Sequence, residues 1–226
     1  MLDRDHALSG ALAGTGLVTL SHFAPIPSVL LIVSTAGAAC IPDLDEPGSA
    51  VADTFRGASR ALASGVKRLA HGHRRGTHTL LSALIVSGVI GGVVILSPIA
   101  LAVLTAILTA VALRCAAPSH YRRDLAILII AAVAGFLSVT HPVPAVPLVL
   151  SFATGYTLHL AGDVVTASGA PLLLPFSDQK ASVPLLGRVG SQREKIAGAV
   201  MIAALALAVW GTFHGLLPSG PHGVRS

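Results

Sequence analysis

The sequence predicts an all-α protein, a polytopic membrane helical bundle of about seven apolar helices plus an amphipathic surface helix. Three observations support this prediction. The chain of 226 residues is 53% hydrophobic, and its mean hydropathy is +0.78. Only 11% of its residues are charged, whereas an average soluble domain carries roughly a quarter. Seven apolar stretches follow one another along the chain, separated by proline, glycine or charged residues.

The seven stretches predict helices over residues 7–20, 26–41, 79–96, 98–113, 124–139, 143–165 and 195–217. Because a transmembrane helix needs about 20 apolar residues, the apolar run 79–113 is too long for one crossing, and Ser97-Pro98 supplies the break for a tight hairpin. Several stretches are short, so we expect some helices to be tilted or partly inserted. We predict a single integral-membrane domain over residues 1–217 and a short C-terminal tail over 218–226.

Residues 49–72 predict the amphipathic helix. Apolar side chains recur there every three or four positions, and basic side chains fill the remaining positions. Two interpretations stay open. The helix lies on the membrane surface, where anionic lipid headgroups attract it, or it packs over the bundle. The apolar positions are Val51, Phe55, Ala58, Leu62, Val66 and Leu69, and the basic ones are Arg56, Arg60, Lys67 and Arg68.

The basic residues predict the orientation of the bundle. Alternate threading of the seven stretches places residues 1–6, 42–78, 114–123 and 166–194 on one side. Of the 15 lysines and arginines, all but Arg225 lie on or next to that side. The positive-inside rule makes this side cytoplasmic, so we expect a multi-pass inner-membrane protein with its active face towards the cytoplasm. Topology thereby explains the net charge of +5, and we expect no direct binding of nucleic acid.

Polar strings at residues 42–45, 75–78 and 159–163 interrupt the apolar pattern. An ionisable side chain at membrane depth costs about 2.5 to 3.5 kcal/mol on insertion scales, so each string is a functional hypothesis. His159 and Asp163 are four residues apart and share one helix face, where they can bind a metal ion together or hydrogen-bond to each other. Asp43 and Asp45 follow Pro42 in a turn, which suits either a divalent cation or a solvated helix end.

The middle string favours an anion site. Thr77 is the expected N-cap of the next helix, and His78 is expected to face back towards the loop. Arg74 and Arg75 stand beside this helix N-terminus, which suits a phosphate group, although topology explains basic residues there equally well. His71, His73 and His120 lie in basic connections and are not expected in the site. The threading brings six candidate ligands towards one face: His6, Asp43, Asp45, His78, His159 and Asp163.

Imidazole and carboxylate groups without thiolate suit zinc, manganese or iron. We expect a divalent metal, with two or three zinc ions as the first expectation and manganese as the alternative. Such ions would generate hydroxide near neutral pH and stabilise charge on a phosphoryl group. The strings therefore predict hydrolysis of a phosphoester at the membrane surface. Asp45, His78 and Asp163 are the candidate catalytic residues, and Arg74, Arg75 and Thr77 are the candidate phosphate-binding residues.

These motifs resemble the YdjM family, described as LexA-binding, inner-membrane-associated proteins with a predicted metal-dependent hydrolase activity. The YdjM family is itself distantly similar to zinc-dependent phospholipase C and related nucleases. His159 and Asp163 match the HxxxD or HxxxE element of those enzymes. It implies that His6, Asp43, Asp45, His78, His159 and Asp163 are metal ligands or their close neighbours. Two departures are Glu46, where relatives can carry histidine, and the additional basic residue in the run 74–76. The matching segments are His6 with Gly10, residues 42–45 with Pro47 and Ser49, residues 73–80, and Gly155-Tyr156, His159, Asp163, Thr166, Gly169, 171–173 and Pro175.

The expected partners are the lipid bilayer, a lipid or phosphoester substrate and a soluble regulatory protein. Two other functions stay open. In a transporter or ion pathway, His159 and Asp163 would form a relay at the membrane midplane. In a regulatory membrane protein, residues 49–72 would bind a soluble partner and the metal site would be structural.

Overall fold

The computed structural model describes residues 1–116 and 124–215, and in these residues the chain is all-helical, as predicted. Seven of the α-helices coincide with the seven apolar stretches, and α3 is the additional one. The predicted tail 218–226 lies outside the described residues, and the single-domain boundary stays a prediction. The elements are α1 (Asp3–Ser21), α2 (Pro25–Ala38), the 3-10 helix η1 (Ile41–Asp45), α3 (Gly57–Leu69), α4 (Leu80–Leu96), α5 (Pro98–Ala116), α6 (Asp124–Thr140), α7 (Ala145–Val164) and α8 (Gln192–His214).

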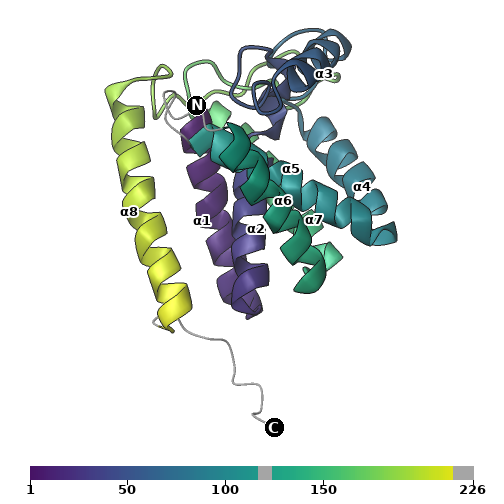
Figure 1. Cartoon of the computed structure of the whole chain (residues 1–226). Coiled ribbons are helices and arrows are strands. Elements are labelled where there is room, and N and C mark those ends of the chain that lie inside the picture. The colour runs from purple at the N-terminus through teal and green to yellow at the C-terminus, as the bar shows by residue number, and fades with distance from the viewer. Residues whose placement is uncertain (117–123, 216–226) are drawn as a thin grey trace.

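Helix α2 forms the centre of the bundle and packs against α1, α5 and α7 (Figure 1). Helices α5 and α6 form an antiparallel pair, α4 packs against α7, and α8 runs along the outer side of α1. The helices α1, α4, α6 and α8 begin at the end of the bundle where α3 lies, and α2, α5 and α7 finish there (Figure 1). Loops and helix termini from distant parts of the chain therefore meet at this end.

Small residues let the central helix approach its neighbours closely. A Cβ atom built on Gly155 of α7 would lie 2.4 Å from the carbonyl oxygen of Thr35 in α2. A Cβ atom built on Gly37 of α2 would lie 2.0 Å from the carbonyl oxygen of Leu108 in α5. Contacts between backbones of this kind are typical of helices that associate in lipid, where packing replaces the hydrophobic effect.

The prediction of about seven membrane-spanning helices is wrong in number. Only α5, α7 and α8 are both long and apolar enough among the described helices to cross a membrane. The apolar helices α2, α4 and α6 have 14, 17 and 17 residues. At 1.5 Å per residue these helices are about 21 to 26 Å long, short of the roughly 30 Å of a hydrocarbon core. The apolar pattern located the helices correctly, but α2, α4 and α6 are too short for a full crossing.

The described lysines and arginines lie together at the α3 end of the bundle. They belong to the first turns of α1 and α8, the last turn of α5, the segment around α3 and the α7–α8 loop. The opposite end carries none in the described part of the chain. This distribution agrees with the predicted threading, although the side of the membrane on which this end lies stays a prediction.

The predicted amphipathic helix over 49–72 is shorter than expected, because residues 49–56 form turns. The hydroxyl of Ser59 accepts a hydrogen bond from the Phe55 amide and donates one to the Ala52 carbonyl, which holds these turns against the start of α3. Arg56 has a φ of 53°, which no α-helix can continue through. Helix α3 contacts η1 and leaves Leu62 and Leu69 57% and 82% exposed, so it covers the bundle and also presents an apolar edge.

Thr79, and not the predicted Thr77, is the N-cap of α4. The Thr79 hydroxyl accepts a hydrogen bond from the Ser82 amide at 2.9 Å, and the Ser82 hydroxyl accepts one from the Thr79 amide at 3.3 Å. The hydroxyl of Thr77 is instead bonded to Asp45. The two-residue shift turns Thr77 and His78 away from the helix and towards the polar end of η1.

We expect Thr79→Ala to lower the free energy of unfolding by about 1 kcal/mol, the usual cost of losing an N-cap. Thermal or denaturant unfolding of the purified protein in micelles measures the change. Thr157→Ala is the matched control, since its exposed hydroxyl bonds only to the Ala153 carbonyl of its own helix. Equal stability of the two variants would contradict the assignment of this cap.

Candidate metal centre

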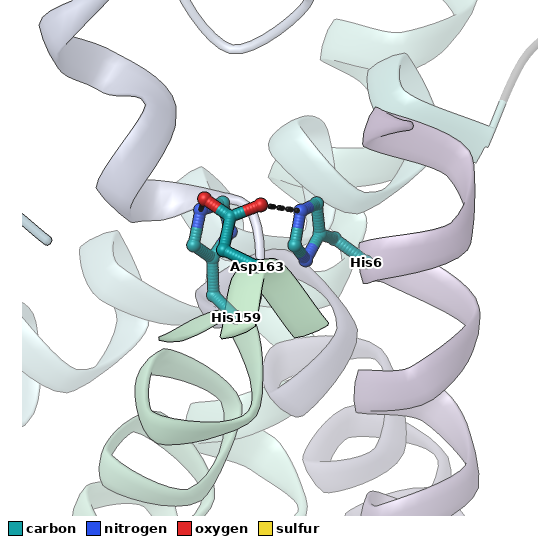
Figure 2. A group of neighbouring side chains, drawn as sticks. All are labelled: His6, His159 and Asp163. Atoms are coloured by element: carbon teal, nitrogen blue, oxygen red, sulfur yellow. Dashed lines mark ion pairs between the residues drawn. The ribbon is translucent and has the colours of Figure 1, made fainter. Parts of the chain in front are cut away.

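The six predicted ligands lie together in one buried cluster at the α3 end of the bundle. His6 comes from the first turns of α1, Asp43 and Asp45 from η1, and His159 with Asp163 from the last turns of α7. His78 comes from the loop before α4. Figure 2 shows the side chains from α1 and α7, with the carboxylate of Asp163 directed towards His6. Asp43 is 7% exposed and the other five are fully buried, so solvent does not compensate their charges.

The end of α2 sets the orientation of His159. The Ala39 carbonyl stands where α2 stops and has no partner within the helix. His159 Nδ1 lies 2.7 Å from this oxygen, which can only accept a hydrogen bond, so Nδ1 carries the proton. Nε2 of His159 therefore has a free lone pair and points into the cluster. A backbone carbonyl in this role is typical of metal-binding histidines.

Thr77 and Asp45 orient His78 in the same way. The Thr77 hydroxyl donates to Asp45 Oδ2, so its oxygen can accept the Nδ1 proton of His78, 2.9 Å away. Asp45 Oδ2 itself lies 3.4 Å from that nitrogen. The Nε2 atom of His78 is then turned inward and lies 3.1 Å from His159 Nε2.

The ligand atoms of Asp43, His78 and His159 form one group within 4.8 Å of one another, and Oδ2 of Asp163 lies next to the two histidine nitrogens. His78 Nε2 lies 3.4 Å from the Asp43 oxygen and 3.5 Å from the Asp163 oxygen. The corresponding distances from His159 Nε2 are 3.6 and 3.8 Å. Tetrahedral zinc with ligands at 2.0 to 2.2 Å places neighbouring ligand atoms about 3.3 to 3.6 Å apart. Asp163 Oδ2 is buried with no hydrogen-bond partner, as expected for a ligand atom.

His6 forms a second grouping with His159 and Asp163. Its ring stacks on that of His159 with centroids 3.8 Å apart, and its Nε2 lies 3.5 Å from Asp163 Oδ1 (Figure 2). Both ring nitrogens of His6 are buried without a hydrogen-bond partner. Because Nδ1 of His159 is committed to Ala39, His159 can bind one ion only, through Nε2. The grouping with His78 and the grouping with His6 therefore share the single lone pair of His159 Nε2.

His73 belongs to the cluster, although the sequence placed it in a basic connection. Its Nδ1 lies 2.7 Å from Asp45 Oδ1, and His73 forms a third possible metal-binding group with Asp43 and Asp45. Arg74 adopts a left-handed φ of 56°, and its amide donates to Asp45 Oδ2 at 3.0 Å. This turn brings His73 and His78 to the same carboxylate. The sequence signal for His73 was a second histidine close to His78, at the start of the segment 73–80.

The three predicted phosphate-binding residues have different environments. Arg74 extends its guanidinium to Asp163 Oδ1 at 2.8 Å, an oxygen that the amino nitrogen of Met1 also contacts at 2.8 Å. Thr77 is bonded to Asp45 and His78. Arg75 alone is half exposed, and its nearest carboxylate is the exposed Asp178 at 3.9 Å. Arg75 is thus the residue of the three that is open to a ligand, and the roles of all three stay predictions.

The histidines and carboxylates of the cluster shift one another's pKa values. Burial opposes the charge on Asp43, but three neighbouring imidazoles outweigh it and hold the pKa of Asp43 well below its usual range. Burial also opposes the charge on Asp45, whose pKa is lowered by His73, His78 and Thr77. Burial disfavours protonated His78, but Asp43 and Asp45 raise its pKa to about 9. The carboxylates are therefore ionised at neutral pH, and a cation would replace the His78 proton.

The fold and this cluster define a membrane protein with a buried His/Asp group that can hold a metal ion. The whole described chain takes part in this arrangement. Residues 1–216 match the family model described as YdjM inner membrane protein, and the chain belongs to this family. The resemblance noted in the motifs is thereby confirmed. No curated protein and no solved structure matches the chain significantly.

Proposed function

We propose that this protein is a metal-dependent hydrolase that cleaves a phosphoester of a lipid or lipid-linked phosphate at the cytoplasmic face of the inner membrane. One observation carries the proposal. Buried ligand atoms of Asp43, His78 and His159 lie within 4.8 Å of one another, and Asp163 Oδ2 lies 3.5 and 3.8 Å from the two histidine nitrogens. Asp163 Oδ2 is also buried without a hydrogen-bond partner, which favours a ligand role for it.

A bound divalent ion, zinc in the first instance and manganese as the alternative, would polarise a phosphoryl oxygen and lower the pKa of water. The protein's own residues supply the rest. Asp43, His78 and His159, with Asp163 beside them, would hold the ion, and Asp45 keeps the proton of His78 on Nδ1 through Thr77. Arg75 holds the phosphate. The third grouping, with His73, would be the place for a further ion, whereas the His6 grouping is an alternative position for the first ion because it needs the same lone pair of His159.

The placement of buried charge argues against the transporter alternative. A relay across the membrane needs ionisable groups at several depths. Among the described residues, the buried ionisable side chains all lie at the α3 end of the helices that carry them, and the buried polar residues further along are serine and threonine. For the regulatory alternative, no described contact identifies a partner surface.

Phosphate release tests the proposal. We expect the zinc-loaded protein to release phosphate from phosphatidic acid in mixed micelles, and Asp163→Asn to reduce the rate more than about a hundredfold, since even supporting residues of metal sites cost 10 to 100-fold. Asp53→Asn, at a carboxylate that pairs with Arg60 outside the cluster, is the control and should retain the wild-type rate. Absence of hydrolysis across lipid phosphates with metal bound would overturn the enzymatic proposal.

A further inference from the structure

Two hollows meet beside the metal centre, between the start of α4 and the α7–α8 loop. The larger has a volume of about 360 Å³, within the roughly 300 to 1,000 Å³ of small-molecule sites. Leu81 and Ile85 of α4 form one wall, and Leu174 and Pro175 of the loop form the other. The lining is thus mainly apolar.

The smaller hollow, of about 220 Å³, is polar and basic. Arg74, Arg75 and Lys180 line it, together with Asp178. Arg75 and Leu174 line both hollows, so the two are adjacent. Arg74 is neutralised by Asp163, and the Arg75 pair with Asp178 is long and exposed, which makes it weak. Within the described part of the chain, no ion pair involves Lys180. Arg75 and Lys180 therefore leave an excess of positive charge.

The apolar hollow is continuous with the outer surface of the bundle. Ile85, which lines the hollow, is 54% exposed, and the adjacent Leu84 on α4 is also exposed. Helix α4 lies at the edge of the bundle, next to the segment that carries α3 (Figure 1). In a membrane this apolar side of α4 faces lipid tails. The basic hollow lies at the other end, where Arg74 reaches the metal cluster.

We infer that the paired hollows bind one lipid molecule that carries a phosphate group, with the phosphate between Arg75 and Lys180 and the first part of an acyl chain between α4 and Leu174. Such a ligand matches both halves: a compact anion for two cations, and an apolar chain that leaves directly into the bilayer. This inference deepens the proposed function and rests on it for the chemistry performed there. It adds the binding site for the lipid phosphate, with Lys180, Leu81 and Leu174 as new contacts.

Alkylphosphonates test the binding without turnover, because their C–P bond does not hydrolyse. The full-length metal-loaded protein in maltoside micelles is titrated with octylphosphonate or methylphosphonate, and native mass spectrometry counts the bound ligand. We expect octylphosphonate to bind about tenfold more tightly or better, a factor that burial of two methylene groups is enough to produce. Leu174→Asn should remove this advantage and leave the affinity for methylphosphonate unchanged.

Lys180→Gln should weaken both phosphonates severalfold, whereas Arg188→Gln, at an exposed arginine of the same loop outside the hollows, should weaken neither. Leu81→Asn, in the opposite wall, replaces Leu174→Asn should that variant misfold.

Equal affinities for the two phosphonates, or equal effects of Lys180→Gln and Arg188→Gln, would overturn the inference. A protein that binds octylphosphonate by these rules and hydrolyses nothing would contradict the proposed function alone. Hydrolysis of soluble phosphoesters with no chain-length effect would contradict this inference and the lipid substrate, and would leave the metal-dependent phosphoesterase activity standing.

Discussion

Zinc-loaded wild-type protein is expected to retain at least one ion per chain after gel filtration, and Asp43→Ala and Asp163→Ala are each expected to bind it more than about a hundredfold more weakly. Each substitution removes a carboxylate oxygen that lies 3.4 to 3.8 Å from the Nε2 atoms of His78 and His159. It also leaves two imidazole nitrogens 3.1 Å apart with less negative charge to hold a cation between them. Metal analysis of the purified proteins by plasma mass spectrometry measures the retained ion, and a competing chelator gives the change in affinity.

Glu46→Ala is the matched control for this experiment. Glu46 follows Asp45 directly, but its carboxylate is exposed and pairs with Lys67 at 3.0 Å instead of facing the cluster. We expect it to retain the wild-type ion content. Wild-type protein that holds no zinc or manganese with Asp163 intact would refute the metal centre, and loss of metal in Glu46→Ala as well would show that general surface charge, not the cluster, binds the ion.

Gly37→Ala is expected to lower the free energy of unfolding by about 3 kcal/mol or more, the upper part of the range for overpacked sites. The added Cβ would lie 2.0 Å from the backbone oxygen of Leu108, which cannot move aside as a flexible side chain could. Helices α2 and α5 would have to separate. Since η1 and the Ala39 carbonyl follow Gly37 within a few residues, we also expect weaker metal binding.

Gly88→Ala on α4 separates packing from helix propensity. Its Cβ would meet no atom within 4 Å, so the substitution should be neutral or stabilise by roughly 0.5 to 1 kcal/mol through the better helix propensity of alanine. Thermal unfolding in the same micelles compares the two variants. Similar stabilities for Gly37→Ala and Gly88→Ala would show that α2 and α5 are not in backbone contact.

The helices and the site face could be predicted because each depends on local pattern. Apolar runs located all seven bundle helices. Alternate threading brought His6, Asp43 and His159 to one end, although more than 150 residues separate His6 from His159. The number of membrane-spanning helices could not be predicted in this way. Hydropathy marks apolar residues, but the length of a helix depends on where its cap and turn close, as Thr79 and Arg56 show.

The sequence by itself determined that this protein is an all-helical membrane protein of the YdjM family with six potential metal ligands at one end. Burial cost explains this, because an apolar chain retains ionisable groups only where they gather and compensate one another. Only the tertiary structure decided which ligand atoms lie close together and that His73 contacts Asp45. It also decided that Arg74 pairs with Asp163 while Arg75 stays open to a ligand. Those choices depend on contacts between η1, α7 and the turn at Arg74, whose relative positions are set by backbone packing across the whole bundle.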